Sequence, residues 1–437
     1  MTRPLERYRE STERRLRRAA RANYRLDIQG LRAVAVLAVF GFHLWGWPRG
    51  GFIGIDVFLV VAGFFAAHVL LTTAAAEGAP FLKRFYADRA RRIIPAASLV
   101  LMITLAASVY LFPPARADQV GLDAAFAFLF LANWHFAGQA VATSAATESV
   151  SPLLHFWPLS IEEQFLIVLP LVILIITVVA VRSQWRDQRF AVATAVVVGA
   201  VTAASLGWAF YQTATSPHWA YFGTFARLWE LGAGALLATA VGALSQIPDR
   251  IRPVLSWMGV GVLAASAVLL VDVTAFPAPG ALLPVAGTLL IIAAGVGREP
   301  VFQPALRNRA FLYVGDISYS LYLVHWPVIV LLAAVMSAGV YYDAAVLALA
   351  FGLAIALHHF VDTPIRYAHP GVIREVRRDL KHGLFVVERA TKVAGVAALV
   401  LVTVSLIAYA ARPDAYGASA ETDCCRPTHA GTYLPQR

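Results

Sequence analysis

The stretch 52–75 reads FIGIDVFLVVAGFFAAHVLLTTAA, and its only ionisable side chains are Asp56 and His68. A helix needs about 20 consecutive, mostly apolar residues to cross the hydrocarbon core of a bilayer. The stretch is therefore predicted to be a transmembrane helix. It also carries a carboxylate in a setting where charge is costly, so Asp56 becomes a candidate functional residue.

The composition extends this prediction to the whole chain. Of its 437 residues, 59% are hydrophobic and 14% are charged, whereas soluble domains are about 45–50% apolar and about 25% charged. The net charge is +10, but the basic residues lie between apolar stretches, which is typical of cytoplasmic loops rather than of nucleic-acid binding. Cys424 and Cys425 are the only cysteines, which excludes a scaffold of several disulfides and a four-cysteine zinc site.

Eleven apolar stretches are long enough to cross a membrane, and together they predict an all-α polytopic membrane protein. They are 31–48, 52–75, 93–112, 158–181, 190–210, 220–243, 254–272, 280–297, 312–337, 341–361 and 393–411.

Lys and Arg mark the cytoplasmic side of a membrane protein. If 113–157 stays on the outer side, dipping into the membrane without crossing it, the Arg-rich connections from 76–92 to 362–392 all fall inside. We therefore predict a cytoplasmic N-terminus, an extracytoplasmic C-terminus and a location in a bacterial cytoplasmic membrane, with membrane lipid as a partner. The sequence carries no signal for an oligomeric state.

Ionisable residues inside the predicted spans are candidates for function. Arg32 and His43 are eleven residues apart, so they lie on one helix face with a rise of about 16 Å between them. By their position in the predicted spans, one group is expected near the outer half: His43, Asp56, Glu162, Glu163, Arg227, Glu230 and His325. A second group is expected at the inner side: Arg32, Arg89, Arg91 and Arg92.

Each of these residues also has a purely structural interpretation. His325 can be a hydrogen-bonding residue between helices, and Arg227 and Glu230 can form a structural ion pair. Arg89 to Arg92 can act only as a signal that fixes the membrane topology. We interpret four further histidines as interfacial: His68, His135, His358 and His359. The spacing of histidines and carboxylates predicts no metal site.

Seven blocks of the sequence, in order over 24–366, are similar to acyltransferase family 3 of bacterial membrane proteins, the O-antigen-acetylase-like O-acyltransferases. The chain resembles that family in Leu26-Asp27-Ile28-Gln29-Gly30-Leu31-Arg32 followed by His43, in Gly51–Phe58 with Ala62-Gly63-Phe64, in Arg89–Ala96, in Leu154–Phe165, in Phe225–Gly234, in Ile317–Pro327 and in Phe360–Arg366. Pro158 departs from the family's usual Ser, and Asp362 from its usual Glu.

The resemblance divides the chain into a membrane acyltransferase core of ten helices and one additional helix. The expected segments are a basic cytoplasmic segment 1–25, the core 26–368, a basic cytoplasmic linker 369–392, the helix 393–411 and a disordered extracytoplasmic tail 412–437. Some relatives continue into an SGNH-hydrolase-like domain, whose sequence blocks do not follow here. We expect that domain to be absent, with a separate SGNH-type protein as a possible partner.

The resemblance implies transfer of an acyl group, commonly acetyl from acyl-CoA, to a hydroxyl of a glycan or glycolipid. Arg89, Arg91 and Arg92 suit the phosphates of CoA, because guanidinium groups match phosphate oxygens. Arg32 would either bind there or order the acyl arm.

An imidazole at His43 is suited to act as a general base or as a transient acyl carrier. Asp56 or Glu163 would orient it. Arg227 would either stabilise an oxyanion or hold Glu230, and His325 is a further candidate catalytic residue. Two other functions stay open: a proton-coupled transporter or flippase, and an inactive membrane protein that binds a partner.

Overall fold

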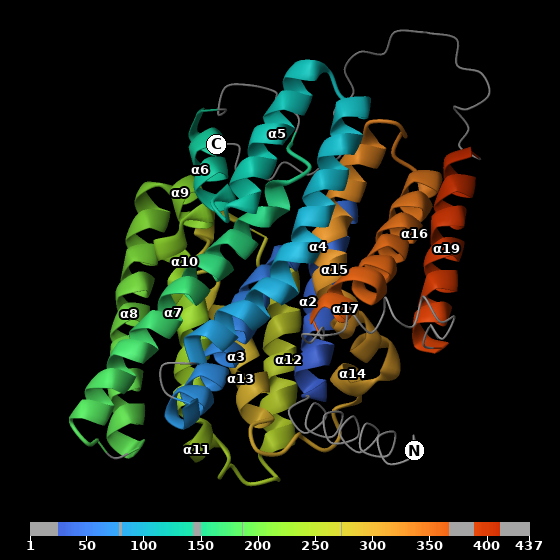
Figure 1. Cartoon of the computed structure of the whole chain (residues 1–437). Coiled ribbons are helices and arrows are strands. Elements are labelled where there is room, and N and C mark those ends of the chain that lie inside the picture. The colour runs from blue at the N-terminus through green and yellow to red at the C-terminus, as the bar shows by residue number, and fades with distance from the viewer. Residues whose placement is uncertain are drawn as a thin grey trace, which may run out of the picture.

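The computed structural model describes residues 25–77, 81–142, 150–185, 187–271, 273–366 and 389–410. Every element in these ranges is a helix, in agreement with the predicted all-α class (Figure 1). The segment 1–24, most of the linker 369–392 and the tail 412–437 with Cys424 and Cys425 lie outside the described residues.

The first half of the bundle contains α2 (Leu26–Trp45), η1 (Gly51–Ile53), α3 (Gly54–Glu77), α4 (Phe81–Leu111), α5 (Pro114–Phe128), α6 (Ala132–Ala142), η2 (Leu154–Phe156), α7 (Trp157–Arg182) and α8 (Asp187–Thr215). The second half contains α9 (Pro217–Phe222), α10 (Thr224–Thr239), α11 (Val241–Leu244), α12 (Arg252–Leu269), η3 (Val273–Ala275), α13 (Leu282–Ala294), α14 (Pro304–Arg307), α15 (Arg309–Ala333), α16 (Val340–Leu357), the π-helical turn η4 (His358–Asp362), α17 (Thr363–Arg366) and α19 (Arg389–Ala410).

Eight helices in the described ranges are long and apolar enough to cross a membrane, so the chain is a multi-pass membrane protein. Helices also form at the other three predicted crossings, but α10 has only 16 residues and α13 only 13. The described apolar part of α19 is Gly395–Val404. Since α10 and α13 both pack against α3, protein covers part of their surface, and a shorter helix suffices there. The total of eleven crossings stays a prediction.

Helix directions follow from facing residues at the interfaces. Gly315 faces Gln29 and His325 contacts His43, so α15 runs parallel to α2. Gly352 faces Leu401, whereas Gly395 faces Phe360, so α19 runs antiparallel to α16. Helix α2 therefore begins at one end of the bundle and α19 finishes at the other, which agrees with an odd number of crossings.

Helix α4 differs from the predicted span 93–112. It begins at Phe81 and has 31 residues, about 46 Å of helix, so the basic stretch that was expected to be a connection forms its first turns. Arg and Lys are good helix formers, which explains this extension. Helix α5 then returns along α4, with Gly121 facing Leu105, and has only 15 residues. Whether 113–157 crosses the membrane stays a prediction, because α5 is no shorter than α13, which we predict to cross.

Helices α3 and α10 approach each other closely at two glycines. A Cβ on Gly63 would overlap the carbonyl oxygen of Leu231, and one on Gly234 would overlap that of Val60. Small residues allow such backbone contact between membrane helices. This contact places Asp56 at the start of α3 beside the polar face of α10.

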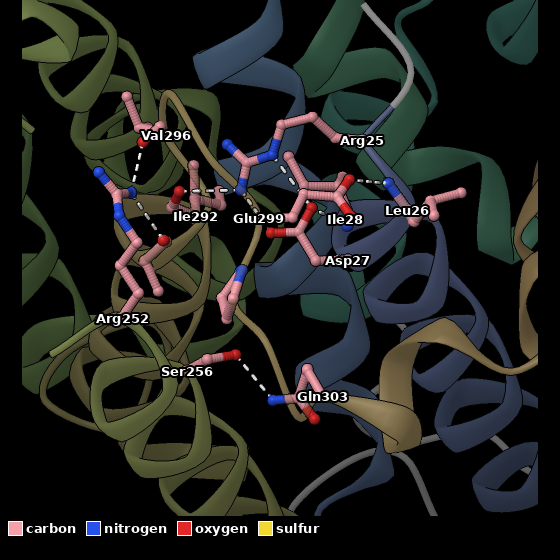
Figure 2. Close-up of polar contacts among 12 residues, drawn as sticks. Arg25, Leu26, Asp27, Ile28, Arg252, Ser256, Ile292, Val296, Glu299 and Gln303 are labelled. Atoms are coloured by element: carbon pink, nitrogen blue, oxygen red, sulfur yellow. Dashed lines mark hydrogen bonds and ion pairs between the residues drawn. The ribbon is translucent and has the colours of Figure 1, made fainter. Parts of the chain in front are cut away.

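A polar cluster fixes the beginning of α2 to the 292–299 turn (Figure 2). Arg25 donates to the buried Asp27 through Nε at 3.0 Å and to the main-chain oxygen of Ile292 at 2.9 Å. The amide of Leu26 donates to Glu299 at 2.6 Å. In the same region, Arg252 donates to the main-chain oxygen of Ala294, the last residue of α13, at 3.0 Å, and to that of Val296 just beyond it. Helix α2, which carries Arg32 and His43, is thereby held at its N-terminal end.

We predict that Gly63→Ala destabilises the protein by about 1–3 kcal/mol, because overpacking forces the backbones of α3 and α10 apart. The measurement is the midpoint of thermal unfolding in detergent. Gly207→Ala in α8 is the matched control, since a Cβ there meets nothing within 4 Å. Equal midpoints for the two variants would contradict the close approach of α3 and α10.

Candidate active site

A pair of histidines joins α2 to α15. His43 Nδ1 lies 2.9 Å from His325 Nε2, and the two rings are nearly parallel, with an angle of 8° between their planes. The histidines are 282 residues apart in the chain. The parallel packing of α2 and α15 brings them together, and His325 is fully buried.

The main chain of α15 determines where the protons of this pair lie. His325 Nδ1 faces the main-chain oxygens of Tyr322 at 2.7 Å and Leu321 at 3.1 Å. Carbonyl oxygens only accept, so Nδ1 carries the hydrogen and Nε2 of a neutral His325 carries the lone pair. His43 Nδ1 must then donate to His325. In the neutral pair, the lone pair of His43 therefore lies on Nε2, the nitrogen suited to accept a proton or attack a carbonyl.

Three further side chains surround the pair. The ring of Trp326 lies 4.6 Å from that of His43, and the ring of His155 lies 5.7 Å from that of His325. Tyr322 donates its hydroxyl to the main-chain oxygen of His155 at 2.6 Å. Sequence reasoning placed these residues in motifs without giving them a role. The available signal was the three-residue spacing of Tyr319, Tyr322 and His325, which puts them on one face of a helix.

Asp56, Arg227 and Glu230 form a buried ion cluster. Arg227 Nη1 lies 2.7 Å from Asp56 Oδ1 and 2.9 Å from Glu230 Oε1, and all three side chains are at most 2% exposed. The Arg227 guanidinium also lies 5.3 Å from the ring of Trp157. The arginine therefore holds Glu230, as one prediction stated, and holds Asp56 as well.

Glu163 does not lie where the sequence placed it. We expected it beside His43, but it pairs with Arg89, whose Nε donates to it at 2.8 Å, and Glu162 contacts the same guanidinium. The reason is that α4 begins earlier than predicted, so Arg89 enters the helical bundle and meets α7. We predicted that Asp56 or Glu163 would orient the His43 imidazole, whereas the group in contact with His43 Nδ1 is His325. Pro158 lies in the first turn of α7, where proline is compatible with a helix.

Arginines gather around this pair. Arg92 interacts electrostatically with three other arginines, Arg366, Arg32 and Arg89, as well as with Glu162. Arg366 is a member that sequence reasoning missed. Arg91 differs from the prediction, because its exposed side chain lies 3.7 Å from Asp88 on the same helix.

Helix α15 connects the arginines to the histidine pair. Tyr319 donates to the main-chain oxygen of Ile93 at 2.9 Å, beside Arg92 in the sequence, and its electrostatic neighbours include Glu163 and Arg89. His325 follows six residues later, about 9 Å along the helix axis. Tyr319, which lies beside the α4 arginines, and His325 are therefore on the same helix, an arrangement suited to an anionic molecule whose reactive end reaches the histidines.

His135 was expected to be interfacial, but its Nε2 lies 2.8 Å from the buried Asp123. No group of three or more His, Cys, Asp or Glu side chains in the described ranges could hold a metal ion.

Comparison with known families and proteins gives a match over most of the chain. The model of a family described as an acyltransferase domain matches residues 25–359. The chain is 30% identical over 356 residues to the peptidoglycan O-acetyltransferase OatA of Listeria monocytogenes, covering 78% of this chain and 55% of that protein. It is 27% identical over 422 residues to the O-acetyltransferase OatA of Staphylococcus aureus, and this match covers 94% of this chain and 67% of that protein. The chain thus spans about half to two thirds of the length of these relatives. No solved structure matches it.

We predict that Arg227→Met destabilises the protein by about 3–5 kcal/mol, because two buried carboxylates lose their shared cation. The midpoint of thermal unfolding in detergent measures the effect. Arg298→Met is the matched control: Arg298 is 70% exposed in its pair with Asp249, and exposed pairs contribute little. A midpoint for Arg227→Met equal to that of the control would show that the cluster does not stabilise the bundle.

Proposed function

The chain belongs to the acyltransferase family whose model matches residues 25–359, and on this premise we propose that it is a membrane O-acyltransferase. It takes an acyl group, most simply acetyl, from acyl-CoA on the cytoplasmic side and transfers it to a hydroxyl of an extracytoplasmic or lipid-linked glycan. The observation that carries the proposal is the His43–His325 pair, because its hydrogen bonds leave the lone pair of His43 on Nε2.

His43 acts in one of two ways. As a general base, its Nε2 takes the proton of the acceptor hydroxyl while the hydroxyl oxygen attacks the thioester carbonyl, and the imidazolium then protonates the departing thiolate. As a carrier, Nε2 attacks the carbonyl itself and the thiolate leaves. The hydroxyl oxygen then takes the acyl group from the acylimidazolium, neutral imidazole is released, and the proton of the hydroxyl passes to water or to the thiolate. In both routes His43 becomes cationic, and the hydrogen bond from its Nδ1 to His325 stabilises that cation.

The arginine cluster binds the donor. CoA carries phosphates, and guanidinium groups bind phosphate oxygens as charge-assisted pairs. Arg89 is already paired with Glu162 and Glu163, so its role is to hold the cluster together. Arg92, which lies among like charges, is the member that gains most from an anion.

A glycan of the cell envelope is the acceptor class that we propose. The Listeria relative is named for peptidoglycan, so peptidoglycan is the first acceptor to test. A transporter or flippase would move its substrate without consuming acyl-CoA, and release of CoA separates the two functions.

We predict that His43→Ala lowers acyl transfer by about 10²–10⁴-fold, the contribution expected of a general base. The measurement uses the purified chain with radiolabelled acetyl-CoA and membrane glycolipid, and follows both CoA release and label on protein or glycan. His68→Ala is the matched control, and it should retain wild-type turnover. Label that stays on wild-type protein would favour the carrier route. Unchanged turnover in His43→Ala would remove His43 from the mechanism.

We predict that Arg92→Gln raises KM for acyl-CoA about tenfold or more, because one charge-assisted contact to phosphate is lost. Initial rates at varied donor and acceptor concentrations give both KM values. Arg84→Gln on the same helix is the control, since Arg84 is 66% exposed. A change confined to the KM for the acceptor would argue against a donor site at Arg92.

A further inference from the structure

Asp123 is a buried carboxylate on α5, outside the helices that carry the histidine pair. Its side chain is 1% exposed. Two strong donors contact it, one on each oxygen: Ser151 Oγ donates to Oδ2 at 2.6 Å and His135 Nε2 lies 2.8 Å from Oδ1. The amides of Gln119 and Gln139 also donate to Oδ1, at 3.1 and 3.3 Å. Gln139 Nε2 also lies 2.9 Å from His135 Nε2. A carboxylate only accepts hydrogen bonds, and the Ser151 hydroxyl and the Gln119 amide donate to it.

A chain of contacts leads from this carboxylate to His43. Ser151, which Asp123 holds through its hydroxyl, accepts a hydrogen bond at its main-chain oxygen from Trp326 Nε1 at 2.9 Å. The indole of Trp326 in turn lies 4.6 Å from the imidazole of His43. Trp326 is 5% exposed, so the indole that packs beside the imidazole is itself buried.

The contacts join two parts of the chain that the membrane bundle alone would not fix. Asp123 and Ser151 both belong to the predicted outer segment 113–157, whereas Trp326 and His43 lie on α15 and α2. A reacting imidazole must be held to within a fraction of an ångström, and supporting hydrogen bonds supply that precision.

We propose that Asp123 is a positioning residue: its carboxylate fixes Ser151, and through Ser151 it fixes the Trp326 indole against His43. Any effect on turnover rests on the function proposed above, in which His43 carries the chemistry. The packing of Trp326 on His43 is independent of that function and is measurable by itself.

The test compares Asp123→Asn, Ser151→Ala and Trp326→Phe in the full chain in detergent. Asp123→Asn replaces one carboxylate oxygen by an NH₂ group, which cannot accept a hydrogen bond. Ser151→Ala removes the hydroxyl that donates to Asp123. Trp326→Phe keeps an aromatic ring but removes the N–H that donates to Ser151. Asp249→Asn is the matched control, because the Asp249 side chain is 56% exposed and lies far from Asp123 in the sequence. The direct readout is the rate at which diethyl pyrocarbonate modifies His43, followed by mass spectrometry, with His68 as an internal reference.

We expect His43 to be modified about threefold faster or more in each of the three variants, because the indole no longer shields it, and kcat to fall about tenfold with KM for acetyl-CoA unchanged. The double variant Asp123→Asn/Trp326→Phe should match the more affected single variant, since both changes break one chain of contacts. Asp249→Asn should behave as wild type.

The proposal would be overturned if His43 in Asp123→Asn were modified at the wild-type rate. It would also be overturned if the effects of the two substitutions added in the double variant. If Asp123→Asn does not fold, Ser151→Ala and Trp326→Phe decide in the same way, because both leave the carboxylate in place. If the wild-type chain releases no CoA but the rate of His43 modification still changes in the variants, the proposed function is contradicted and the positioning role is supported.

Discussion

Charged side chains inside a membrane bundle persist only where other charges or hydrogen-bonding groups pair with them, because the surrounding hydrocarbon offers none. In the buried cluster of Arg227, Asp56 and Glu230, the arginine pairs with both carboxylates. Its members come from α3 and α10, and those helices approach closely enough only because glycine occupies the contact. Larger residues at these glycines would push the helices apart, and loss of the arginine would leave the two carboxylates without the cation that they share.

The same constraint organises the other two polar centres. Arg89 enters the bundle because Glu162 and Glu163 meet it there, and this pairing leaves the remaining arginines with an excess of positive charge. A neutral histidine pair needs hydrogen bonds rather than counter-ions, and the main chain of α15 accepts one from His325. A cationic site and a neutral basic site thus coexist along one helix, which suits binding of an anion at one point and proton transfer or acyl transfer at another.

The outer segment contributes more than its sequence indicates. We predicted that it does not cross the membrane, and the sequence singled out His135 and the start of the Leu154–Phe165 motif in it. In the structure, His155 and Ser151 from this segment reach the histidine pair through α15. Asp123 joins several parts of this segment, because it contacts Gln119, His135, Gln139 and Ser151.

The sequence alone determined the helical class, the positions of the apolar stretches and the polar residues within them, because length and hydrophobicity are local properties. It identified His43, His325, Asp56, Arg227, Glu230 and most of the arginines as candidates. The tertiary structure decided their partners. Glu163 pairs with Arg89 across 74 residues and His43 with His325 across 282, and such pairings depend on which helices lie side by side. For the same reason, only the fold determined which nitrogen of His43 carries the lone pair.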